Sequence, residues 1–267
     1  MAVTSIARRG DAAALTRATH LAKPVVMAGE RTLAVLPALA PLFPDGGLRR
    51  GNVLTVGGTG GATSLALALT VAAAEEGSWV AGMGLASLGL AAAAGLGVPL
   101  ERLVLVRDPG STGRNEVLAT LLDSFDIVLV GAGGRGAERT TGAHRRLQAK
   151  GRERGSVLVA VGGAGGFEPD LRLRAETAGW DGLEPGAGHL QGRRVVVEAG
   201  GRRAAMRPRR TVLWLPAADG TVQSAVAPAS AVSIPPPEGL WVTYPSPTRI
   251  RDPQTDSSEG AVAALAG

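Results

Sequence analysis

The sequence has no cysteine and few aromatic residues, and both absences restrict what the chain can be. Without cysteine it can form neither a disulfide framework nor a thiolate metal site, which suits a reducing compartment. The three histidines are scattered, so we expect no histidine-based metal site, and we predict neither a metal nor a cofactor. Because aromatic residues make up only 3% of the chain, the core has to be built from Val, Leu and Ala.

Lysine is also scarce, and Lys23 and Lys150 are the only two. The net charge of +5 is therefore carried by arginine, a bias typical of a GC-rich coding sequence. A positive balance permits nucleic acid or an acidic partner. Charge is missing from residues 78–100, a run long enough to cross a membrane. This run is dense in Gly and Ala and divides into a strand and a short helix, so we predict no membrane span and a cytoplasmic protein.

Short apolar segments alternate with helical segments through the first two thirds of the chain. The expected strands are residues 53–56, 79–81, 103–106, 126–130 and 157–161. The expected helices are residues 64–76, 85–95, 116–122 and 143–154. This alternation predicts an α/β fold with a mainly parallel central sheet flanked by helices. Three later strands, residues 171–175, 194–198 and 211–215, have no helices between them and predict an antiparallel extension at one edge.

Three regions differ in composition. Residues 1–45 are expected to form an N-terminal helical and lead-in segment, and residues 46–220 the core. Residues 221–267 are rich in proline and are expected to form a flexible tail. Trp241 and Tyr244 stand out in this tail as possible docking anchors for a partner, with folding back onto the core as the alternative.

The chain is organised around residues 51–70, which are expected to be a buried strand, a glycine-rich turn and an apolar helix. This order is typical of a phosphate-binding loop, in which backbone N–H groups and a lysine hold the phosphates. Here Ala62 stands at the lysine position, and the loop is one residue short of the usual spacing. We therefore expect only the remnant of such a loop, with no cofactor bound. Its residues are Gly57, Gly58, Gly60, Gly61, Ala62, Thr63 and Ser64.

Several segments resemble the core of the RecA recombinases over about residues 32–220. Residues 46–54 (GGLRRGNVL) resemble the opening of that core, and residues 96–103 (LGVPLERL) resemble the lead-in to its third strand. Residues 126–130 (DIVLV) resemble its Walker B strand. Residues 170–174 and 193–198 resemble its later edge strands.

The departures from that family concern its catalytic groups. The resemblance places Ala62 at the phosphate-binding lysine, Gly131 at the carboxylate that supports Mg²⁺, and Leu85 at the glutamate that activates water. Loss of all three leaves no group to stabilise the developing charge or to orient the water, so we predict a protein that is not an enzyme.

Residues 61–69 (GATSLALAL) and 77–81 (GSWVA) are similar to the short, high-GC form of the ImuA-type mutasome accessory proteins. This resemblance implies a non-catalytic adaptor in damage-induced translesion DNA synthesis, associated with the nucleoid after damage. The implied partners are an inactive Y-family polymerase homologue and, through it, an error-prone C-family polymerase and the sliding clamp. The candidate contact elements are residues 1–45, by resemblance, and the tail after Pro216.

Three alternatives stay open. One is a cell-division inhibitor of the SulA kind, which also uses a RecA-like fold without nucleotide. The second is a weak DNA-binding RecA paralogue. The third is an ATPase with a relocated lysine, for which Lys23 and Lys150 are the only candidates.

Two arginine clusters are candidate contacts with DNA or an acidic partner, or else a solvated face. The first surrounds the helix at residues 143–154 and comprises Arg135, Arg139, Arg145, Arg146, Arg152 and Arg154. The second lies on and between the expected edge strands and comprises Arg193, Arg194, Arg202, Arg203, Arg207, Arg209 and Arg210.

Overall fold

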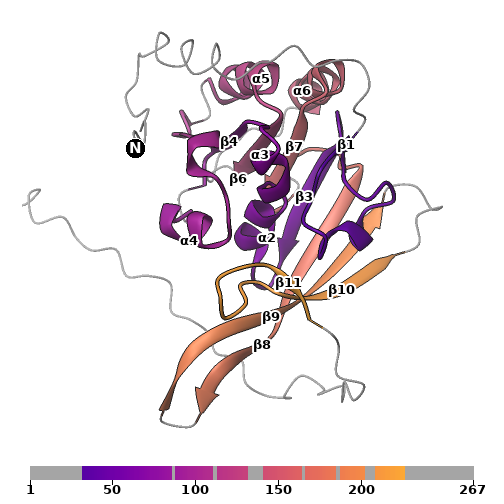
Figure 1. The fold of residues 1–267 in the computed structure, drawn as a ribbon. Helices are drawn as coiled ribbons and strands as arrows, with labels where there is room; N and C mark the ends of the chain where they lie inside the picture. Colours follow the sequence, from indigo (N-terminus) through magenta and orange to yellow (C-terminus); the bar gives the residue numbers. More distant parts are fainter. Residues whose placement is uncertain are drawn as a thin grey trace, which may run out of the picture. The chain divides into compact units, whose positions relative to one another are not determined.

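Nine strands of the described part of the chain form one sheet, in the order β11-β10-β9-β8-β3-β7-β6-β4-β5 (Figure 1). The structure is a computed structural model that describes residues 32–85, 88–110, 113–131, 141–163, 166–184, 187–201 and 208–225. The expected N-terminal helix, His20 and Lys23 lie outside these residues, as do Trp241, Tyr244 and the proline-rich tail beyond residue 225.

The parallel half of the sheet confirms the predicted α/β class. It consists of β3 (Val53–Gly58), β7 (Val157–Val161), β6 (Ile127–Gly131), β4 (Val80–Met83) and β5 (Leu103–Val106). Four of these strands are almost wholly buried, as expected for near-continuous apolar strands covered on both faces.

Helices cover both faces of this parallel half. On one face lie α2 (Ala62–Ala68), α3 (Val71–Glu75) and α4 (Leu90–Gly95), whose buried residues form one apolar cluster with the sheet. On the other face, α5 (Arg114–Ser124) and α6 (Thr141–Arg154) form a second cluster. A short 3-10 helix, η2 (Leu100–Arg102), leads into β5. No helix of the described residues is long and apolar enough to span a membrane.

The expected single helix at residues 64–76 is divided in two. Thr70 is fully buried, and its hydroxyl donates a 2.8 Å hydrogen bond to the carbonyl oxygen of Leu67. The Thr70 N–H bonds the same carbonyl instead of the one a turn earlier. A threonine side chain that competes for backbone groups in this way interrupts a helix, so α2 ends at Ala68 and α3 begins at Val71.

The antiparallel extension is also confirmed, and it is longer than predicted. It consists of β8 (Leu171–Glu184), β9 (Ala187–Gly201), β10 (Arg209–Trp214) and β11 (Gln223–Ser224), with β8 pairing parallel to β3. Buried and exposed residues alternate at the start of β8, so one face joins the core and the other is solvated. The β8–β9 pairing shifts register between Thr177 and Gly179, and beyond this point the hairpin extends past the core.

The segment before β3 packs onto this extension. It contains β1 (Thr32–Leu33), paired antiparallel with β2 (Leu48–Arg49), and the 3-10 helix η1 (Ala40–Leu42). Leu39 and Leu42 are fully buried in the same cluster as α2. Residues 32–45 therefore belong to the folded core.

Candidate functional site

The glycine loop is shorter than the sequence suggests, because β3 continues through the first two glycines. Gly57 and Gly58 pair with Arg174 and Ala175 of β8. Gly58 has φ +126°, and a Cβ there would lie 1.9 Å from the carbonyl oxygen of Ala175, so only glycine allows this close approach. Residues 59–61 alone connect β3 to α2, so the glycine-rich turn is three residues long.

A guanidinium from β9 lies beside this loop. An Nη atom of Arg193 donates a 2.9 Å hydrogen bond to the hydroxyl of Ser64, and its Nε donates a 2.8 Å bond to the carbonyl oxygen of Leu215. The guanidinium carbon lies 5.3 Å from the ring centre of Trp180, and a Cβ built on Gly61 would lie 3.4 Å from an Nη atom of the same group. Burial lowers the pKa of Arg193 from its ordinary value, which is so far above neutral that the side chain remains a cation.

Gly131, which the family resemblance places at the metal-binding carboxylate, has no room for a side chain. Gly131 ends β6, and a Cβ built on it would lie 2.1 Å from the carbonyl oxygen of Gly84, at the end of the neighbouring β4. The same Cβ would lie 3.4 Å from a methyl group of Leu85, the residue at the position of the water-activating glutamate. Leu85 itself packs against the apolar cluster on the α2 face.

An internal ion pair covers these strand ends. Arg114, at the start of α5, donates a 2.6 Å hydrogen bond to the carbonyl oxygen of Gly131 and forms an ion pair with Asp108. The carboxylate of Asp108 lies 2.9 Å from where a Cβ on Gly84 would stand. Burial lowers the pKa of Arg114, which nevertheless stays charged near neutral pH.

A buried histidine lies on the other helical face. His144 of α6 packs against Phe167, with 4.5 Å between the ring centres, and its Nδ1 has no hydrogen-bond partner among the described residues. Burial, assisted by the charge of Arg114, lowers the pKa of His144 and favours the neutral ring. Its surroundings are those of a core residue that holds the turn after β7, and no group of three potential metal ligands occurs in the described part of the chain.

The second arginine cluster divides between two faces of the antiparallel extension. Arg193 faces α2, whereas Arg194, on the opposite face, lies 5.6 Å from the ring centre of Trp214 and 3.6 Å from Asp181. Arg209 donates hydrogen bonds to the carbonyl oxygens of Pro41 (3.1 Å) and Phe43 (2.9 Å), and Arg210 lies 3.7 Å from Glu198. The remaining members, Arg202, Arg203 and Arg207, lie outside the described residues. The described arginines thus do not form one continuous patch.

The first arginine cluster is partly described. Arg145 and Arg146 are exposed on α6, Arg154 pairs with Asp123 at 2.9 Å, and Arg152 lies 3.6 Å from Asp170. Arg135 and Arg139 lie outside the described residues. Contact of either cluster with DNA or a protein stays a prediction.

The chain has a RecA-like fold. The crystal structure of the RadB recombinase is similar to it with a TM-score of 0.52 and 15% sequence identity, covering 74% of this chain and all of that one. A family model described as the MT3502 N-terminal domain matches residues 41–165. The uncharacterized protein Rv3395c of Mycobacterium tuberculosis is 35% identical over 156 residues, which are 55% of this chain and 74% of that protein. The chain belongs to the family of Rv3395c.

Proposed function

We propose that the protein is a non-catalytic RecA-like adaptor in damage-induced translesion DNA synthesis. The observation that carries this proposal is the lack of space at Gly131, where a Cβ would meet the carbonyl oxygen of Gly84 at 2.1 Å. A carboxylate cannot be accommodated at that position unless the ends of β6 and β4 move apart.

The other two departures support the same reading. Ala62 provides no charge at the loop, and Leu85 places an apolar side chain where water would have to be activated. Removal of one positioned group from a catalytic site typically lowers the rate by about two to three orders of magnitude, so the loss of several leaves little turnover. We infer that the protein keeps this fold in order to bind partner proteins and not for catalysis.

The proposed partners follow from the resemblance to the ImuA-type accessory proteins. They are an inactive Y-family polymerase homologue and, through it, an error-prone C-family polymerase and the sliding clamp. We propose that this takes place in the cytoplasm, at the nucleoid after DNA damage. Membership of the Rv3395c family and the RecA-like fold agree with the proposal without specifying the pathway.

The test is co-purification of the tagged full-length chain with the polymerase homologue from damaged cells. Two truncated variants refine it, one without residues 1–31 and one without residues 226–267, because the structure assigns residues 32–45 to the core. We expect the intact chain to retain the homologue and at least one truncation to lose it. Arg174→Ala, a change on the solvated face of β8, is the matched control and should retain it. If the intact chain never retains the homologue, the proposal is wrong.

A further inference from the structure

A cavity of about 970 Å³ opens at the end of the sheet opposite the glycine loop. It lies at the amino ends of β3 and β8, between the segment that carries β2 and the last turn of α6. Ligands of open α/β sheets ordinarily bind at the carboxyl ends of the strands, so this cavity is separate from the ancestral nucleotide position. Its volume is at the upper end of the range for ligand sites, which suits several residues of a peptide better than a single ion.

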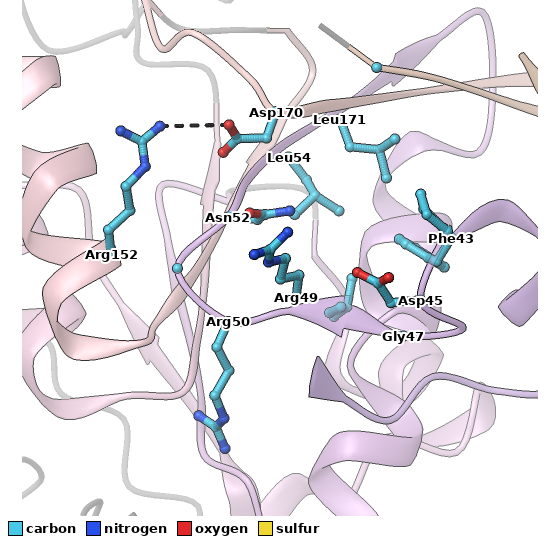
Figure 2. Close-up of a pocket in the computed structure, with 14 residues that line it drawn as sticks. Phe43, Asp45, Gly47, Arg49, Arg50, Asn52, Leu54, Arg152, Asp170 and Leu171 are labelled. Carbon is cyan, nitrogen blue, oxygen red and sulfur yellow. Dashed lines mark ion pairs between the residues drawn. The ribbon is translucent and has the colours of Figure 1, made fainter. Parts of the chain in front are cut away.

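The cavity is closed at its floor by buried residues, and its rim is charged. Leu48, Leu54 and Leu171, from β2, β3 and β8, are at most 5% exposed, so they offer a ligand little apolar surface. Figure 2 shows Arg152 on one side and Phe43 with Asp45 on the other, with Arg49 between them. A ligand in this cavity would therefore mainly contact the charged groups at its two edges.

The guanidinium groups at this cavity differ in how firmly they are held. Arg50 extends away from the other lining side chains in Figure 2, and donates a 2.9 Å hydrogen bond to Asp126. Arg152 lies 3.6 Å from Asp170 and its side chain is 55% exposed. Arg49 is exposed and makes no hydrogen bond or ion pair through its side chain with any described residue. Two guanidinium groups, those of Arg49 and Arg152, are thus available to a ligand.

The acidic residues of the lining determine which class of anionic ligand the cavity can bind. Asp170 accepts a 2.9 Å hydrogen bond from the N–H of Val53 through one oxygen and lies 3.6 Å from Arg152 through the other, so both of its oxygens already have partners within the protein. Asp45 is exposed at the far edge, where it would repel phosphates and carboxylates alike, but its oxygens can accept hydrogen bonds from peptide N–H groups, which a phosphate backbone lacks. Phe43, the aromatic residue of the lining, is only 4% exposed, so the cavity offers no stacking platform for bases. These features favour a peptide over a nucleic acid.

We propose that this cavity is a docking site for an acidic peptide segment of a partner protein, whose carboxylate side chains pair with Arg49 and Arg152. Arginine forks bind carboxylates with two parallel charge-assisted hydrogen bonds, which gives both strength and orientation. The inference concerns a surface far along the strands from the glycine loop, and it holds whichever pathway the partner belongs to.

The test uses the full-length protein labelled with ¹⁵N and an acetylated probe peptide. The probe has about eight residues with Glu alternating with Leu or Ser, a length that spans the cavity in extended form. Its matched control has Gln in place of every Glu. We expect the Glu peptide to shift the backbone amide signals of residues that line the cavity, such as Arg49, Asn52 and Leu171, and the Gln peptide to shift them far less.

Two variants sharpen the result. The double change Arg49→Ala with Arg152→Ala should weaken binding about tenfold or more, because it removes two charge-assisted contacts. Asp45→Asn should strengthen binding, since it removes a repulsive charge from the same rim. Arg172→Ala with Arg174→Ala, on the solvated face of β8, removes the same number of charges and should leave the affinity unchanged.

Three outcomes would overturn the proposal. The first is an absence of shifts at the cavity with millimolar Glu peptide. The second is an unchanged affinity in the Arg49/Arg152 double variant, with its spectrum showing an intact fold. The third is an equal response to a short single-stranded oligothymidylate that is lost in that same variant, because this would make the cavity a general polyanion site.

Discussion

Gly131→Ala tests the structural basis of the missing carboxylate with a single methyl group. A Cβ at this position would lie 2.1 Å from the carbonyl oxygen of Gly84 and 2.8 Å from its carbonyl carbon, so backbone atoms have to move. Both are backbone atoms of Gly84, at the end of a packed central strand, so the clash cannot be relieved by the movement of a flexible side chain. Overpacking of this kind costs about 1–3 kcal/mol of unfolding free energy.

This cost can be read from thermal unfolding followed by circular dichroism. For a domain of this size, each 1 kcal/mol lowers the melting temperature by about 2–4 °C, so we expect a fall of about 2–12 °C. The matched control is Gly57→Ala near the end of β3, two strands away from β6 in the sheet, where a Cβ meets nothing within 4 Å. That control should be neutral or stabilise by about 0.4–1 kcal/mol. If both variants melt within about 1 °C of the wild type, the steric reasoning is refuted.

Two further changes probe the groups near these strand ends. Arg114→Ala removes the bond to the carbonyl oxygen of Gly131 and leaves Asp108 unpaired, so urea unfolding should show a loss of about 1–3 kcal/mol; an unchanged midpoint would contradict the role given to this ion pair. The pKa of His144 is lowered in the folded state, so the unfolded chain binds its proton first as the pH falls below about 6.5. Stability should therefore decline from pH 7.5 to pH 5 more steeply in the wild type than in His144→Gln, by at most about 1.4 kcal/mol per pH unit, and parallel pH profiles would exclude this contribution.

The alternating apolar segments were sufficient to predict the α/β class and its antiparallel edge. Strands at Leu103–Val106 and Val157–Val161 were predicted with the observed bounds, because short runs of Val and Leu between turns are compatible with few structures other than a strand. The length of β8 and β9 was not predictable in this way. Beyond Ala175 the described residues of β8 are exposed or half-buried, and residues 187–191 of β9 are exposed, so pairing in the outer part of the hairpin depends on register and not on burial.

The candidate site shows where sequence reasoning ends. The absence of a loop lysine could be read directly at Ala62. The contact between Arg193 and Ser64 could not, because 129 residues separate them and only the fold of β9 beside α2 brings them together. The same holds for the cavity, whose rim joins Arg49 to Arg152 from opposite halves of the core. Local sequence patterns show which catalytic groups are absent, whereas only tertiary contacts show which side chains lie in their place.

The measurement that tests the central claim most directly is the binding and turnover of Mg·ATP by the intact protein, with Ala62→Lys for comparison. Because Gly131 and Leu85 still provide neither a metal ligand nor a base, we predict no saturable turnover from the wild type, and none from the variant with its lysine restored. Saturable hydrolysis by the wild type that disappears in Arg193→Ala would contradict the account, because it would mean that the guanidinium beside the loop has taken over the work of the missing lysine.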